Sequence, residues 1–164
     1  MSAPAKASNA PPVFGPIGPV DHLGIAVKSL AEGKAVYGGA MGLRLVFEEE
    51  VPTEKVRVAA YDGGGVRLEL LESTDPTGPV AKFLEKRGPG IHHVCYRVND
   101  IAAALRGLRA KGIEPLGQAP RPGAGGCQVA FIHPKDAGGV LVELSQHPPG
   151  GARHGAERPT GRGS

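Results

Sequence analysis

The sequence predicts an α+β fold in which two tandem βαβββ modules form one cupped, barrel-like mixed sheet. An internal repeat is the first observation behind this prediction, because the order of elements expected in residues 20–73 recurs in residues 91–147. The second is a matching pair of polar residues, with one His early and one Glu late in each half. The third is the length of 164 residues, which suits one domain with a core of its own.

The first module is expected to begin with a strand over residues 20–27. A helix follows from Ser29, because Ser29 and Glu32 have the spacing of a capping box, in which each side chain satisfies one free backbone N–H. The helix is expected to end near Gly42. Three short strands complete the module, over residues 43–47, 56–61 and 66–71.

A connector over residues 74–90 joins the modules and includes a short helix that ends at Gly88. The second module repeats the pattern with a strand over residues 91–98 and a helix capped at Asn99 or Asp100. The flanks, residues 1–19 and 148–164, are rich in Pro or Gly and lack apolar periodicity. We expect both to be disordered, which leaves residues 20–147 as the working domain.

The repeat aligns His22 with His93, and Glu69 with Glu143. If the two halves curl around a common axis, these four side chains face one cavity. Imidazole and carboxylate ligands suit a borderline divalent ion such as Co, Ni, Zn, Mn or Fe, with positions left open for water or substrate. A metal would also offset the cost of burying two Glu within apolar strands. Glu side chains that face solvent on half-exposed strands are the alternative.

Strand alternation separates the neighbours His92 and His93, because adjacent residues point to opposite faces. The repeat selects His93 for the cavity. Asp21 occupies the position that matches His92, so we expect Asp21 and His92 to lie on the outer face or at an interface. Cys95 shares a face with His93, and its expected role is that of a small apolar filler.

Composition restricts the compartment and the partners. The net charge of +3 is small, and the basic residues are scattered without accompanying aromatic residues, which argues against nucleic acid as a partner. Two cysteines are too few for a disulfide framework and fit a reducing compartment. The sequence offers no transit-peptide pattern or membrane-span length, so a soluble cytoplasmic protein without membrane partners is the expectation.

Five motifs stand out in the expected domain. They are HLGIAV (22–27), KFLEKRG (82–88), GIHHVCY (90–96), FIHPK (131–135) and GVLVELSQ (139–146). Together they resemble the motifs of the methylmalonyl-CoA epimerases of the vicinal oxygen chelate superfamily. The resemblance implies interconversion of (R)- and (S)-methylmalonyl-CoA through a metal-stabilised enolate, by removal and return of the proton α to the thioester. It also implies a homodimer and a divalent metal, Co²⁺ in the first place and Zn, Ni or Mn otherwise. The implied metal ligands are His22, Glu69, His93 and Glu143.

Inversion requires two proton-transfer groups on opposite faces of a planar intermediate. Glu143 is the candidate for one of them. The second, which some relatives place on the strand after the helix, is missing, because residues 56–59 read Val-Arg-Val-Ala. The nearby alternatives are Glu48, Glu49 and Glu54.

An acyl-CoA substrate would need cations for its phosphates, and Arg121, Lys135 and Lys82 are the candidates. Three other functions share this framework. A glyoxalase-I-like lyase would act on a glutathione hemithioacetal, and a ligand-sequestering resistance protein would need no metal. A ring-cleaving dioxygenase would use two His and one carboxylate, so the additional Glu69 disfavours it.

Overall fold

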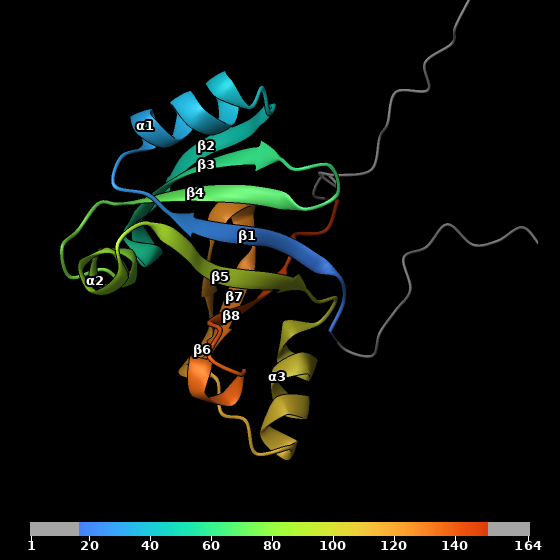
Figure 1. Cartoon of the computed structure of the whole chain (residues 1–164). Coiled ribbons are helices and arrows are strands. Elements are labelled where there is room, and N and C mark those ends of the chain that lie inside the picture. The colour runs from blue at the N-terminus through green and yellow to red at the C-terminus, as the bar shows by residue number, and fades with distance from the viewer. Residues whose placement is uncertain (1–16, 151–164) are drawn as a thin grey trace, which may run out of the picture.

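The computed structural model describes residues 17–150, in which eight strands form one sheet in the order β2-β3-β4-β1-β5-β8-β7-β6 (Figure 1). The strands are β1 (Val20–Ala26), β2 (Leu45–Val51), β3 (Val56–Asp62), β4 (Arg67–Ser73), β5 (Gly90–Arg97), β6 (Leu116–Pro122), β7 (Gln128–Ile132) and β8 (Val142–Gln146). Most of the two flanks expected to be disordered, 1–19 and 148–164, lies outside the described residues.

The sheet is mixed, and its two halves repeat the same pairing. In the first module β1 runs parallel to β4, and in the second β5 runs parallel to β8. The antiparallel pair β1–β5 joins the modules at the centre of the sheet. The sheet curls, as Figure 1 shows, and its two end strands are β2 and β6. The predicted α+β fold of two βαβββ modules is confirmed.

Each module carries one helix on its sheet, and a third helix joins the modules (Figure 1). These are α1 (Leu30–Lys34), which the π-helical turn η1 (Ala35–Ala40) continues, α2 (Pro79–Arg87) and α3 (Ile101–Ala110). Ser29 caps α1 as predicted, because its Oγ accepts a hydrogen bond from the backbone N–H of Glu32 at 3.3 Å. The N–H of Leu30 donates instead to Glu72 of β4 at 2.6 Å, so α1 is fastened to the sheet.

The prediction misplaced strand β2 by several residues. It was expected over residues 43–47, but it runs from Leu45 to Val51 and includes the acidic run Glu48–Glu50. This strand is an edge of the sheet, where charged side chains remain in water and discourage pairing with other chains. An acidic run at an edge is therefore compatible with a strand.

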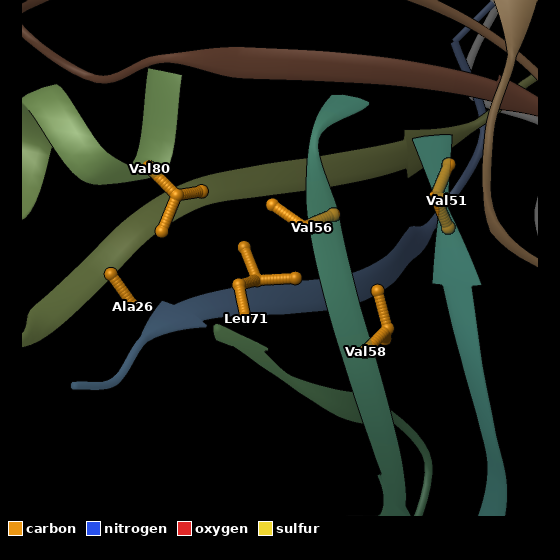
Figure 2. Packing of buried hydrophobic residues seen from close by; sticks show 6 residues of the cluster. All are labelled: Ala26, Val51, Val56, Val58, Leu71 and Val80. Carbon is orange, nitrogen blue, oxygen red and sulfur yellow. The ribbon is translucent and has the colours of Figure 1, made fainter. Parts of the chain in front are cut away.

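The first module has two buried apolar clusters. One lies between the sheet and α2, and its buried members are Ala26, Val51, Val56, Val58, Leu71 and Val80 (Figure 2). The other lies between the sheet and α1 and comprises Leu30, Ala59, Tyr61 and Leu70. In the second module, a cluster beneath α3 comprises Val98, Ile101, Ala104, Leu105, Ala130 and Leu144. No helix within residues 17–150 is long and apolar enough to cross a membrane.

Candidate active site

The four predicted ligands come together on the four central strands of the sheet. His22 lies on β1, Glu69 on β4, His93 on β5 and Glu143 on β8, and all four are buried. Nε2 of His22 lies 3.2 Å from Nε2 of His93, 3.4 Å from Oε2 of Glu69 and 3.6 Å from Oε2 of Glu143. Nε2 of His93 lies 2.8 Å from the same Glu143 oxygen.

This arrangement fits a divalent cation. Two ligand atoms at about 2.1 Å from one ion are roughly 3.0–3.4 Å apart when their bonds meet at octahedral or tetrahedral angles. The four distances of 2.8–3.6 Å span this range. The donors are imidazole nitrogen and carboxylate oxygen, which suit a borderline ion with open positions. The ligand atoms of His22, His93 and Glu143 all lie within 4.8 Å of one another, whereas Glu69 lies outside this group and approaches it through His22. The role of the four residues as ligands stays a prediction, and the spacing of the first three agrees with it.

Asp21 and His92 are not on the outer face, the first of the two places expected for them. The register of β1 with β5 shifts between Val20 and His22, which leaves Asp21 as an extra residue. A second shift, between Gly24 and Ile25, leaves His92 as the extra residue on the opposite strand. Such bulges re-aim side chains beside functional sites. The alternation rule therefore fails at these two positions.

Each of the two bulged residues contacts the ring of the adjacent His. Oδ2 of Asp21 lies 2.8 Å from Nδ1 of His22, and Nδ1 of His92 lies 3.0 Å from Nδ1 of His93. A partner on Nδ1 fixes the orientation of the ring and leaves Nε2 for a metal ion. The repeat therefore extends to residues that orient the two imidazoles, one acidic and one basic.

Asp21 is the centre of a buried network of charges. Besides His22, it accepts hydrogen bonds from Arg67 at 3.0 Å, Arg97 at 2.8 Å and His147 at 2.8 Å. Burial alone would raise the pKa of Asp21, but the hydrogen bonds from His147 and His22 and the charge of Arg67 hold it well below its usual range. The carboxylate therefore stays ionised and holds the His22 ring in place.

The electrostatics of the site keep Glu143 ionised and Cys95 neutral. Burial would raise the pKa of Glu143, yet the charge of His93 and hydrogen bonds from both imidazoles hold it far below its ordinary value. Burial raises the pKa of the Cys95 thiol. A protonated thiol is a poor metal ligand, which agrees with the predicted role of Cys95 as an apolar filler.

A cavity of about 830 Å³, part of it open to solvent, lies over the four ligand candidates. One wall is the apolar cluster of Figure 2, of which Val51, Val56, Val58, Leu71 and Val80 line the cavity. The strand where a second proton-transfer group was sought therefore presents Val56 and Val58 to the cavity, whereas Arg57 is exposed and pairs with Glu72.

Of the three alternative acidic residues, only Glu54 lines the cavity. It follows β2 in the 3₁₀ turn η2 (Pro52–Glu54), and it pairs with Arg121 of β6. The exposed Glu48 pairs with Lys34 at 2.6 Å. The carboxylate of Glu49 accepts a hydrogen bond from the backbone of Gly125.

Arg121 is the one of the three predicted phosphate contacts that the structure places in the cavity wall. Its guanidinium stacks over the Phe131 ring at 5.1 Å, and its side chain keeps 41% of its accessible surface. Lys135, in the 3₁₀ turn η4 (Pro134–Asp136), and Lys82, in α2, are exposed and do not line the cavity. Contact of any of these cations with coenzyme A stays a prediction.

Sequence reasoning missed three residues beside the site, Arg67, Arg97 and His147. Arg67 could have been found, because it precedes Glu69 by two residues on a strand and so shares its face. Arg97 and His147 gave no comparable signal, since they reach Asp21 from β5 and from the residue after β8.

The two-module sheet and its buried His–Glu quartet define a vicinal oxygen chelate fold. A family model of the glyoxalase/bleomycin resistance protein/dioxygenase superfamily matches residues 21–131. The ethylmalonyl-CoA/methylmalonyl-CoA epimerase of Cereibacter sphaeroides is 40% identical over 132 residues, which cover 79% of this chain and 98% of the relative.

Two solved structures share the fold. The methylmalonyl-CoA epimerase of Mycobacterium tuberculosis has a TM-score of 0.80 at 37% identity, with 84% of this chain and 93% of the other covered. A Streptomyces coelicolor methylmalonyl-CoA epimerase in complex with 2-nitronate-propionyl-CoA has a TM-score of 0.77 at 33% identity, with 80% and 98% covered. The chain therefore belongs to the methylmalonyl-CoA epimerase family of this superfamily.

Proposed function

We propose that this protein is a metal-dependent epimerase that interconverts the (R) and (S) forms of methylmalonyl-CoA. The observation that carries the proposal is the convergence of His22, Glu69, His93 and Glu143 in the wall of one cavity, in a chain that belongs to this epimerase family. When bound there, a divalent ion, Co²⁺ in the first place, supplies Lewis-acid stabilisation of the negative charge that develops on the thioester oxygen. A homodimer is proposed on the family resemblance alone.

The residues of this chain supply the catalytic base and an apolar environment around it. Glu143 is buried in the cavity wall, and its carboxylate is the group that we propose as the base for the proton α to the thioester. The valine and leucine side chains of the apolar wall exclude water beside it. An apolar surrounding strengthens electrostatic interactions at the site.

Glu54 is the residue that we propose as the second proton-transfer group. It belongs to the first module and lines the cavity, whereas Glu143 belongs to the second module. A hydrogen bond of 3.2 Å from Nη2 of Arg121 to Oε2 holds its carboxylate in place. Carboxylates from opposite modules could address the two faces of a planar intermediate, which inversion requires.

The test of the proposed function is exchange of the substrate α-proton for deuterium in D₂O, with chirality followed in parallel. Metal-stripped protein should be inactive, and protein refilled with Co²⁺ should exchange and racemise methylmalonyl-CoA. Glu143→Gln should abolish both activities while a parallel titration shows whether Co²⁺ still binds. Glu85→Gln, on the exposed surface of α2, is the matched control and should behave as the wild type.

Two outcomes would contradict the proposal. Protein that binds Co²⁺ yet neither exchanges nor racemises methylmalonyl-CoA is not an epimerase of this substrate. Turnover of a glutathione hemithioacetal by the same preparation would instead establish the glyoxalase-I-like alternative.

For the second group, Glu54→Gln should retain exchange of the α-proton in one epimer and lose its conversion to the other. One face of the intermediate then keeps its base, and the opposite face lacks a donor. Glu48→Gln is the control, because Glu48 is exposed and pairs with Lys34. Racemisation by Glu54→Gln at the wild-type rate would exclude this role.

A further inference from the structure

Arg67 is a buried arginine that contacts one of the four ligand candidates. Its Nε and Nη2 lie 2.9 and 2.8 Å from Oε1 of Glu69, two residues later on β4. Arg67 is only 7% exposed and Glu69 only 3%. A buried cation is costly unless its partners compensate for the lost water, so this pair is a specific feature of the site and not a surface ion pair.

The contact divides the two oxygens of Glu69 between two tasks. Both nitrogens of Arg67 approach Oε1, whereas Oε2 is the oxygen that lies 3.4 Å from Nε2 of His22. A planar guanidinium that contacts one carboxylate oxygen through two N–H groups restricts rotation of that carboxylate. Arg67 therefore leaves the other Glu69 oxygen free to face Nε2 of His22, the ligand candidate that Glu69 approaches.

Arg67 also joins the two ligand candidates of the first module. Its Nη2 donates to Oδ2 of Asp21 at 3.0 Å, and the same oxygen lies 2.8 Å from Nδ1 of His22. One guanidinium thus contacts Glu69 directly and reaches His22 in two ways, through Asp21 and by its own Nη2, which lies 3.4 Å from Nδ1 of His22. The charges of Glu69 and Asp21 raise the pKa of Arg67 although burial opposes this, so the guanidinium is positively charged.

The charge of Arg67 also changes the net charge of the site. Glu69 and Glu143 together cancel the two charges of a divalent ion, and Arg67 adds one positive charge. A site that had a neutral amide in place of Glu69, and no arginine, would carry the same net positive charge. Arg67 and Glu69 therefore act together as a substitute for one neutral ligand.

We propose that Arg67 is a positioning residue for the metal site, which orients Glu69 through Oε1 and offsets its negative charge. The inference depends on the proposed function, because it assumes that a divalent ion binds to the quartet. It predicts that Arg67 matters for metal binding mainly while residue 69 is a glutamate.

The experiment is a double-mutant cycle with Arg67→Gln and Glu69→Gln, read by Co²⁺ affinity and by the visible absorption spectrum of the Co²⁺ protein. In the wild-type background, Arg67→Gln should lower the affinity by about 10–100-fold and change the spectrum, as expected when a residue that orients a ligand is lost. In the Glu69→Gln background the same change should lower the affinity less than about threefold and leave the spectrum unaltered.

The matched control is Arg57→Gln, which removes an arginine from the exposed pair with Glu72 on strands of the same module. It should leave Co²⁺ affinity unchanged. If Arg67→Gln fails to fold, Arg67→Lys replaces it, because lysine keeps the charge but loses the planar pair of donors. The lysine variant should lose part of the affinity, and this loss should disappear in the Glu69→Gln background.

The outcomes separate the two proposals. Wild-type protein that binds no divalent ion at the quartet overturns the proposed function and the role of Arg67 together. Wild-type protein that binds Co²⁺, with equal losses from the Arg67 change in both backgrounds, overturns the role of Arg67 alone and leaves a structural contribution through Asp21. Unchanged affinity in the single variant also overturns it.

Discussion

Gly24 is the position where the smallest change should do the greatest harm to the site. It lies on β1 opposite His93, and a Cβ at Gly24 would overlap the His93 ring, 2.6 Å from Nε2 and closer still to Cε1 and Nδ1. Non-bonded carbon atoms require about 3.5 Å or more, so the ring in Gly24→Ala must retreat by roughly 1 Å. Contacts with His92 and Phe131 on its other sides resist that movement.

The size of the effect follows from this displacement. Overpacking of this kind costs about 1–3 kcal/mol of the free energy of unfolding, which corresponds to a fall in Tm of roughly 4–12 °C for a domain of this size. Metal sites tolerate deviations of about 0.2 Å in ligand distance. A shift of His93 by roughly 1 Å should therefore lower Co²⁺ affinity by about 100-fold or more.

The assay is thermal unfolding of the metal-free protein together with Co²⁺ titration. Gly90→Ala is the control, because Gly90 pairs with Ala26 in the same two strands and a Cβ there meets no atom within 4 Å. It should leave both quantities close to wild type. A Gly24→Ala protein with wild-type Tm and Co²⁺ affinity would refute the argument that close approach to His93 requires glycine.

Two further predictions concern stability. Leu70→Ala should lower the free energy of unfolding by about 2–5 kcal/mol, because Leu70 is fully buried. Leu45→Ala on the edge strand, the control, should change it by less than about 0.5 kcal/mol. Equal losses of the two variants in urea unfolding would contradict the packing described. A hydrogen bond to Asp21 raises the pKa of His147 to about 9, above its unfolded value of about 6.5. The stabilisation of the folded protein by this contact should therefore be complete below about pH 6.5 and disappear as the pH rises through 9. Over this interval, the Tm of His147→Gln should fall less than the Tm of the wild type. If the plots of Tm against pH are parallel for the two proteins, the contact does not stabilise the fold.

The fold and the quartet could be predicted because both depend on the repeat. Each module must bury one face of its sheet, so its apolar residues recur with the same spacing, and the polar exceptions within them, such as Glu69 and Glu143, become visible. The bounds of strand β2 were predicted wrongly. In an edge strand, charged residues such as Glu48–Glu50 keep their side chains in water while their backbone pairs with the neighbouring strand. The sequence alone does not distinguish such a strand from a loop.

The surroundings of the quartet depend on contacts that no spacing in the sequence reveals. The strand alternation rule assumes an uninterrupted ladder, and the bulges at Asp21 and His92 break it at the residues next to the candidate ligands. Arg97 and His147 reach Asp21 across 76 and 126 positions of the chain. Only the three-dimensional structure brings such residues together.

The bulges also explain how a repeated fold can give two unequal halves of one site. Both modules place a polar residue against Nδ1 of a buried histidine, but the partner is the carboxylate of Asp21 in one and the imidazole of His92 in the other. An ionised carboxylate makes His22 the stronger electron donor, whereas burial and the neighbouring His93 lower the pKa of His92 to about 4 and leave it neutral near pH 7. The repeat therefore supplies equivalent candidate ligands, and the residue before each histidine makes them chemically different.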